Sequence, residues 1–170
     1  MLTSRQREVV DAAERLLEAE GPEALTMRRL GSAIGIKAPS LYKHFPDKAA
    51  LEAALAARAL EGMAEALAGA GDFRALARAY RAYALAHPRL YRLTMDRPLP
   101  RERLPEGLEA RAAGPVVAAL GEPNRARAAY AFAHGMVSLE LAGRFPPGAD
   151  LDAAWEAAAA AFAGGHDGAG

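Results

Sequence analysis

The chain has 170 residues, of which 52% are hydrophobic, enough to build one sizeable domain or two small ones. Lysine plus arginine and aspartate plus glutamate both number 21, so the chain is not a polycation that coats nucleic acid through its net charge. It has no cysteine, which excludes disulfides and cysteine-based zinc sites, and no apolar run long enough to predict a membrane span, so we expect a cytoplasmic protein.

Apolar residues recur at helical spacing along the whole chain, which predicts an all-α fold of about nine helices: a three-helix head followed by an antiparallel helical bundle. The first helix is expected to begin at Thr3, which has capping-box spacing to Gln6, and to end at Gly21-Pro22. Its apolar stripe has no partner except the segment that follows. The first three helices should therefore close a small core around Leu25, Leu30, Ile34, Leu41 and Phe45.

Residues 26–48 have the pattern of a helix-turn-helix. Thr26 can cap the first of its helices, and Leu30, Ala33 and Ile34 would form that helix's apolar stripe. Gly35 would end it, because glycine adopts the left-handed conformation without steric cost. A short second helix is then expected.

This second helix is predicted to begin at Lys37 or Ala38 and to end at Pro46, since the residue before a proline disfavours helical angles. On a helical wheel one face is apolar and the opposite face is polar and basic. The apolar face holds Ala38, Leu41 and Phe45; the opposite face holds Pro39, Ser40 and Lys43, flanked by Tyr42 and His44. The outward face is of a kind that can lie in a DNA groove.

Lysine occurs in this chain at positions 37, 43 and 48 and nowhere else. With Arg28 and Arg29, these lysines face one acidic residue in the segment, Asp47, so the segment is locally basic. Short basic clusters are about as often a solvated face as a binding surface. The helix punctuation around this cluster favours DNA.

The run from Gly21 to Leu51 resembles the DNA-binding domain of the TetR family of transcriptional regulators. The matching residues are Gly21, Ala24, Leu25 and Thr26 at the entry, Gly35-Ile36 at the turn, and then Leu41, Tyr42, His44, Phe45, Pro46, Lys48 and Leu51. The resemblance implies a fold that binds double-stranded DNA. From it and the wheel, we expect DNA contacts from Thr26, Arg28, Lys37, Ala38, Pro39, Ser40, Tyr42, Lys43, His44 and Lys48.

Within this set, Thr26, Tyr42 and Lys48 are expected on phosphates. The expected contacts to base edges come from Pro39, Ser40 and Lys43, with Arg28 as a further candidate. Tyr42 has an alternative role as a half-buried residue that seals the head. Lys37 departs from the family, which often has serine or threonine there. A lysine at the positive end of a helix dipole is mildly unfavourable, and a bound phosphate would relieve it, so we expect Lys37 to contact phosphate.

The remaining elements are expected in the following order. Asp47 caps a fourth helix that runs to residues 69–71, Asp72 caps a fifth that ends at His87-Pro88, a short helix covers 88–95, and residues 97–105 form a loop. Helices then cover about 105–120, interrupted or kinked at Gly114-Pro115, and 123–145, and the last begins at the Asp150 cap. We expect a DNA-binding domain over 1–48, a ligand-binding and dimerisation domain over 49–163, and a disordered tail over 164–170.

The last two helices are rich in small residues and are the expected dimer interface, with packing within one chain as the alternative. The candidate interface residues are Ala129, Met136, Leu139, Gly143, Trp155, Ala158, Ala159 and Phe162. The family resemblance implies that these helices join a second copy as a four-helix bundle. Two heads about one DNA turn apart, roughly 34 Å, would read a palindromic operator.

The C-terminal half also resembles a subgroup of the family named for a Trp-His-Gly motif, through His87-Pro88 and His134-Gly135, with Tyr130 in place of the tryptophan. This resemblance implies a small-molecule effector. The candidate pocket residues are Tyr80, Tyr83, Tyr91, Met95, Tyr130 and His134. Aromatic residues at helical spacing are more often plain core, and His134 has the alternative of a hydrogen-bonded core histidine.

Catalysis is not expected. The four histidines are scattered without metal-ligand spacing, and the common nucleophile, phosphate-loop and dinucleotide motifs are missing, so neither a metal nor a cofactor is predicted. The protein is expected to be a dimeric repressor, which is the usual role in the family. A small-molecule effector is expected to release it from DNA. The alternative is an adaptor that keeps the fold and binds protein instead of DNA.

Overall fold

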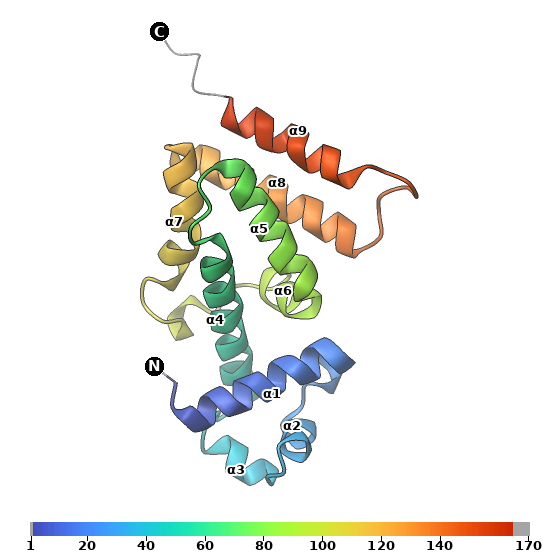
Figure 1. Cartoon of the computed structure of the whole chain (residues 1–170). Helices are drawn as coiled ribbons and strands as arrows, with labels where there is room; N and C mark the ends of the chain where they lie inside the picture. Colours follow the sequence, from blue (N-terminus) through green and yellow to red (C-terminus); the bar gives the residue numbers. More distant parts are fainter. Residues whose placement is uncertain (1, 165–170) are drawn as a thin grey trace. The chain divides into compact units, whose positions relative to one another are not determined.

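The structure is a computed structural model in which residues 2–164 are described. These residues form nine α-helices, two short 3-10 helices and no strand, which confirms the predicted all-α fold (Figure 1). The α-helices are α1 (Ser4–Glu20), α2 (Met27–Ala33), α3 (Ala38–Tyr42), α4 (Lys48–Leu67), α5 (Phe73–Ala86), α6 (Pro88–Met95), α7 (Leu108–Leu120), α8 (Pro123–Leu141) and α9 (Leu151–Ala163), and the 3-10 helices are Pro22–Ala24 and Arg101–Arg103. The tail prediction falls almost wholly on residues 165–170, outside the described range.

The chain divides into two compact units. The head unit contains Met1–Glu61 and His87–Leu108, and the bundle unit contains Gly62–Ala86 and Glu109–Gly170. The head unit includes α6 because α6 packs against α1. The predicted boundary at residue 48 separates a DNA-binding part from a ligand-binding part and does not coincide with the boundary between the two compact units. It stays a prediction.

The head unit has one apolar core, to which α1, α2, α3, the first part of α4 and α6 contribute. Four of the five predicted core residues are buried, at 3% exposure or less: Leu25, Leu30, Leu41 and Phe45. The fifth, Ile34, is partly buried against this core. Ala33, the last residue of α2, was predicted on the same stripe and is exposed.

Side-chain caps begin several helices as predicted. In α1, Thr3 Oγ1 accepts from the Gln6 N–H at 3.2 Å and Gln6 Oε1 accepts from the Thr3 N–H at 2.9 Å, a complete capping box. The carboxylates of Asp47, Asp72 and Asp150 accept from backbone N–H groups three residues later, at 2.6, 2.8 and 2.9 Å. These bonds are local in sequence, which is why sequence spacing located them.

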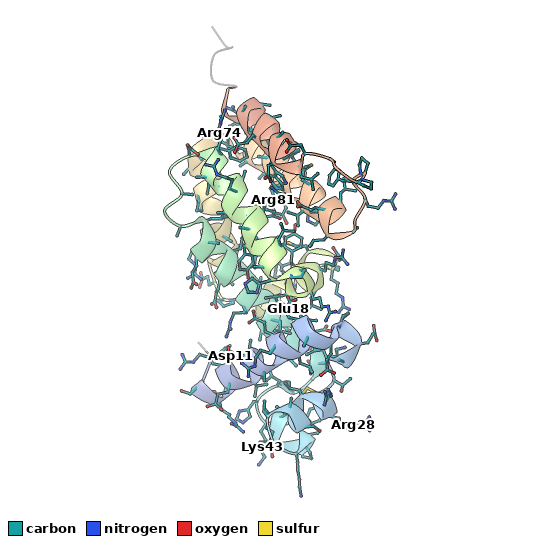
Figure 2. All side chains as sticks on the ribbon, turned by 45° about the vertical axis from the view of Figure 1, so that its right-hand side comes forward. Asp11, Glu18, Arg28, Lys43, Arg74 and Arg81 are labelled. Carbon is teal, nitrogen blue, oxygen red and sulfur yellow. The ribbon has the colours of Figure 1, made fainter. Side chains whose placement is uncertain are left out.

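In the bundle unit, α5 packs against both α8 and α9. Arg81 of α5 connects the three helices: its guanidinium donates to both oxygens of Glu140 at 2.7 and 3.0 Å and to Asp152 at 2.5 Å. The same guanidinium lies 5.8 Å from the centroid of the Trp155 ring. Figure 2 labels Arg81 together with Arg74, which pairs with Glu156 of α9. Charge-assisted and cation–π contacts thus supplement the apolar packing among α5, α8 and α9.

Helix α8 ends at Leu141, and the predicted end near Phe145 is wrong. Gly143 has a φ of 62°. Its N–H donates to the Glu140 carbonyl at 3.0 Å, and the Arg144 N–H donates to the Leu139 carbonyl at 3.0 Å. This is a Schellman motif, which closes a helix with a left-handed glycine. Gly143, predicted on the interface face of α8, therefore lies beyond the helix.

Of the two alternatives predicted at Gly114-Pro115, the interruption is wrong, because α7 is continuous from Leu108 to Leu120 with Pro115 inside it; the kink stays a prediction. A proline removes one backbone hydrogen bond, and the neighbouring turns can keep theirs. Within residues 2–164, no helix combines the length and the apolarity needed to cross a membrane.

Candidate nucleic-acid interface

Helix α2 begins and ends as the sequence predicts. The Thr26 hydroxyl accepts from the Arg29 N–H at 3.1 Å. At the other end, the Ile36 N–H donates to the Gly31 carbonyl at 2.9 Å, and Gly35 has a φ of 69°. These features form a Schellman motif, so the turn between α2 and α3 is fixed by backbone hydrogen bonds.

Gly31 lies where this turn passes closest to α2. A Cβ atom added to Gly31 would lie 2.7 Å from the Ile36 carbonyl oxygen, a backbone atom that no rotamer change can move. Glycine is required here by the close approach of two backbone segments and not by an unusual φ. The packing of α2 against α3 depends on this contact.

Helix α3 is shorter than predicted and ends at Tyr42, not at Pro46. The His44 and Phe45 N–H groups both donate to the Leu41 carbonyl, each at 2.9 Å, so the last turn tightens before the proline. Leu41 and Phe45 are buried at 0% and 3% exposure. These two side chains anchor α3 and the residues after it in the core of the head unit.

The ten residues predicted to contact DNA are mostly accessible. Seven are exposed, namely Thr26, Arg28, Lys37, Pro39, Tyr42, Lys43 and Lys48, and three are half-buried, namely Ala38, Ser40 and His44. Figure 2 shows Arg28 and Lys43 projecting from the part of the head that contains α2 and α3. Tyr42 is 50% exposed, so its ring can be reached by a ligand even where part of it is packed.

Lys37 is the N-cap residue of α3, and no side chain caps this helix end. Pro39 occupies one of the first two helical positions, which suits its missing N–H. The start of α3 therefore has an exposed cation beside backbone N–H groups. An anion bound there would interact with the partial positive charge of the backbone N–H groups and with the full positive charge of Lys37.

Lys48 pairs with one carboxylate, and two arginines pair with acidic residues at the start of α4; none of these contacts was predicted. Lys48 Nζ lies 3.6 Å from a Glu52 oxygen, and that oxygen also lies 3.2 Å from the Arg97 guanidinium. Arg103 lies 3.3 Å from Asp47. Lys48 and Glu52 stand four residues apart in α4, which is a local spacing. The two arginine pairs have no local signal, because the loop after α6 meets the start of α4 only through the tertiary fold.

Asp47 has a defined electrostatic role at this helix start. The Ala50 N–H and, more weakly, the Arg103 guanidinium hold the pKa of the Asp47 carboxyl below its usual value. The carboxylate is therefore the stable form, and it occupies the positive end of α4. On α2, Arg29 is paired with Glu20 at 2.6 Å, which lowers the pKa of Glu20 and turns Arg29 toward α1.

The residues predicted to bind an effector divide between the two units. Tyr91 and Met95 belong to the head unit, whereas Tyr80, Tyr83, Tyr130 and His134 belong to the bundle unit. In the bundle unit, the Tyr80 and Tyr130 rings meet edge to face at 6.2 Å, and the Tyr130 and His134 rings stack at 6.3 Å. Tyr80, Tyr130 and His134 thus form a connected aromatic row.

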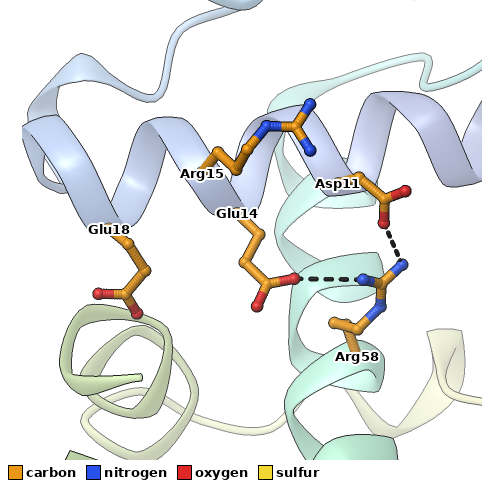
Figure 3. A pocket seen from close by; sticks show the side chains of 5 residues that line it. All are labelled: Asp11, Glu14, Arg15, Glu18 and Arg58. Carbon is orange, nitrogen blue, oxygen red and sulfur yellow. Dashed lines mark hydrogen bonds and ion pairs between the residues drawn. The ribbon is translucent and has the colours of Figure 1, made fainter. Parts of the chain in front are cut away.

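A surface pocket of about 310 Å³ lies elsewhere, in the head unit, and has polar walls (Figure 3). It is lined by Asp11, Glu14, Arg15, Glu18 and Arg58, none of which was predicted as a site residue. Arg58 reaches from α4 to Asp11 at 2.6 Å and Glu14 at 3.2 Å. The Glu18 carboxylate accepts from the backbone N–H groups of residues 89 and 90, at 3.2 and 2.8 Å. The pocket walls thus serve to hold α1, α4 and α6 together.

The predicted interface residues differ in exposure. Ala129, Trp155 and Ala159 are buried within the chain, Trp155 against Phe132 with ring centroids 5.8 Å apart. Met136, Ala158 and Phe162 are less accessible than Leu139, which is 45% exposed. A part of the predicted interface is therefore used for packing within the bundle unit, and Leu139 is the most accessible large apolar member.

Among residues 2–164, no group of three or more histidine, cysteine, aspartate or glutamate side chains is placed to hold a metal ion. The accessible chemistry of the head unit is instead cationic and hydrogen-bonding, on a short helix beside a fixed turn. That arrangement suits a polyanion with accessible base edges.

Comparison with known proteins places both parts of the chain in one family. Residues 9–55 match the bacterial regulatory proteins of the tetR family, and residues 73–162 match the tetracyclin repressor-like C-terminal domain. Over 152 residues the chain is 34% identical to an uncharacterized HTH-type transcriptional regulator of Mycobacterium tuberculosis, covering 79% of this chain and 69% of that protein.

Solved structures show the same fold. A TetR variant from Acinetobacter baumannii AYE in complex with minocycline has a TM-score of 0.68 and 26% identity, covering 96% of this chain and 95% of that one. BioQ with its double-stranded DNA operator has a TM-score of 0.63 and 20% identity, covering 94% and 98%. At 20% identity, the likeness to BioQ concerns the fold.

Proposed function

This chain belongs to the TetR family of bacterial transcriptional regulators, and we propose that it is a homodimeric, effector-responsive repressor that binds a palindromic operator through α2 and α3. Members of this family regulate transcription and are not enzymes. In this proposal the protein acts in the cytoplasm, where operator DNA is found.

The observation that supports this proposal most directly is the two-sided character of α3. Leu41 is completely buried, while Tyr42 and Lys43 beside it are exposed. In the proposed complex, Lys37, Tyr42 and Lys48 bind phosphates, and Pro39, Ser40 and Lys43 face base edges. An adaptor that binds protein would not require all the lysines of the chain to lie in 37–48.

For the effector, we propose the aromatic residues of the bundle unit, Tyr80, Tyr83, Tyr130 and His134, as the contact surface. The related A. baumannii protein was solved in complex with minocycline, a small-molecule ligand, and aromatic side chains offer apolar stacking surface to small molecules. Helix α4 has residues in both units, so in this proposal an effector changes the separation of the two heads through α4.

The test begins with selection of a duplex from a random DNA library by the wild-type protein. Tyr42→Ala and Lys48→Ala should each weaken binding to that duplex at least about tenfold, because each substitution acts in both heads of the dimer and phosphate binding dominates DNA affinity. For Lys48→Ala, the slope of log affinity against log salt should also fall by about 0.9 for each phosphate that the variant no longer neutralises.

Arg144→Ala is the matched control, because it removes an exposed cation from the bundle unit. It should leave affinity and salt slope unchanged. Sedimentation should show that the head variants assemble like the wild type. Wild-type affinity in both head variants would refute the assignment of α2 and α3, and failure to enrich any duplex would favour the adaptor.

A further inference from the structure

One side chain of α1 reaches the residues that close α3. Gln6 is half-buried, whereas all of residues 2–5, 7 and 8 are exposed. Its Nε2 group donates to the His44 carbonyl oxygen at 3.1 Å, across 38 residues of sequence. His44 follows α3 by two residues, so the bond connects the first turn of α1 to the end of the DNA-facing segment.

Both ends of the Gln6 amide are engaged. Oε1 accepts from the Thr3 N–H at 2.9 Å, while Nε2 donates to His44. Turning the amide over would place a donor against a donor at Thr3 and an acceptor against an acceptor at His44, so neither bond could form. The capping box of α1 therefore holds Gln6 in the orientation that His44 requires.

The turn from α2 constrains the start of helix α3, but few other directional contacts constrain its end. It has five residues, far too few to be stable alone, and no side chain caps its start. Burial of Leu41 and Phe45 fixes its position, but apolar contacts have little directionality. A hydrogen bond is directional, so the bond from Gln6 restricts rotation of the last turn, next to Tyr42 and Lys43.

We propose that Gln6 is a positioning residue for sequence-specific DNA recognition, acting through the His44 carbonyl and without touching DNA. This inference rests on the proposed function of the head. It assigns a role in recognition to the Gln6 side chain, which would otherwise serve only the cap of α1.

Two variants separate the His44 bond from the capping box. Gln6→Glu keeps an oxygen that accepts from the Thr3 N–H but has no donor for His44. Thr3→Val removes the hydroxyl of the box but leaves the His44 bond. Amide hydrogen exchange at His44 and Phe45 should accelerate about fivefold in Gln6→Glu and stay within about twofold of wild type in Thr3→Val, as expected for removal of one net hydrogen bond. Unchanged exchange in Gln6→Glu would overturn the proposal.

Gln6→Met tests recognition without adding charge near DNA. On the duplex selected by the wild-type protein, it should bind about threefold to tenfold more weakly, but on an unrelated duplex of equal length its affinity should fall by less than about twofold. Thr3→Val should change neither affinity. Equal weakening on the two duplexes would indicate a general structural defect and overturn the positioning role.

The two levels of the inference fail in different ways. If the wild-type protein enriches a duplex and Gln6→Met binds it equally well, the role of Gln6 is wrong and the function of the head stands. If the wild-type protein enriches no duplex, the proposed function fails, and the recognition role of Gln6 fails with it.

Discussion

Lys37 is an unusual N-cap residue. It begins α3 without a side-chain hydrogen bond, where serine or threonine would satisfy a backbone N–H. Its cation also lies at the positive end of the helix. Both features are expected to cost stability in the free protein, and we propose that Lys37 compensates for this cost by binding a phosphate of the operator.

Lys37→Ser should therefore raise the stability of the free protein or leave it unchanged, with a gain of up to about 1 kcal/mol from the new cap. The same variant should weaken binding to the selected duplex and lower the salt slope by about 0.9 for each phosphate that it no longer neutralises. Thermal unfolding and DNA binding at several salt concentrations measure the two effects. An unchanged salt slope would show that Lys37 does not contact phosphate.

The turn between α2 and α3 is specified by backbone proximity. Gly31 is buried in α2, and its α-carbon faces the Ile36 carbonyl across the turn. The Ile36 N–H returns to the Gly31 carbonyl, so the two residues hold one another at close range. Any side chain at position 31 must push the turn away from α2.

Gly31→Ala should destabilise the head by about 1–3 kcal/mol, the usual cost of overpacking against atoms that cannot move aside. Gly135→Ala in α8 is the matched control, since nothing lies within 4 Å of a Cβ added there. It should stabilise the protein by about 0.5–1 kcal/mol, the helical preference for alanine. Thermal unfolding of both variants measures these changes, and equal shifts would contradict the close approach.

Assembly into a dimer is the proposal that concerns the whole molecule. The buried members of the predicted interface, Ala129, Trp155 and Ala159, are already used within one chain. Leu139 on α8 stays 45% exposed and is available to a second copy. A two-fold pairing along α8 would cover it in both copies.

Leu139→Glu should weaken the dimer at least about tenfold, because a carboxylate would be buried without a partner. Leu85→Glu, at a residue of α5 that is 39% exposed, is the control and should leave the dimer intact. Analytical ultracentrifugation over a range of concentrations measures both. A dimer that tolerates Leu139→Glu would place the interface elsewhere.

The sequence determined the features that depend on neighbouring residues. Helix starts at Thr3, Thr26, Asp72 and Asp150 follow from a side chain that reaches an N–H three residues later, and Gly35 ends α2 through its own φ. The helical spacing of apolar residues likewise predicted four buried residues of the head, namely Leu25, Leu30, Leu41 and Phe45. Such features need no information about distant parts of the chain.

The tertiary structure decided what depends on residues far apart in sequence. Three features connect segments that only the fold brings together. They are the close approach that requires glycine at position 31, the Gln6 bond to His44, and the Arg97 contact with Glu52 beside Lys48. The sequence also did not predict the end of α3 at Tyr42, after which the His44 and Phe45 N–H groups both donate to the Leu41 carbonyl. Local hydrogen bonds are encoded by spacing, whereas contacts between distant segments, such as the bond from Gln6 to the residues after α3, depend on the fold and are not encoded by spacing.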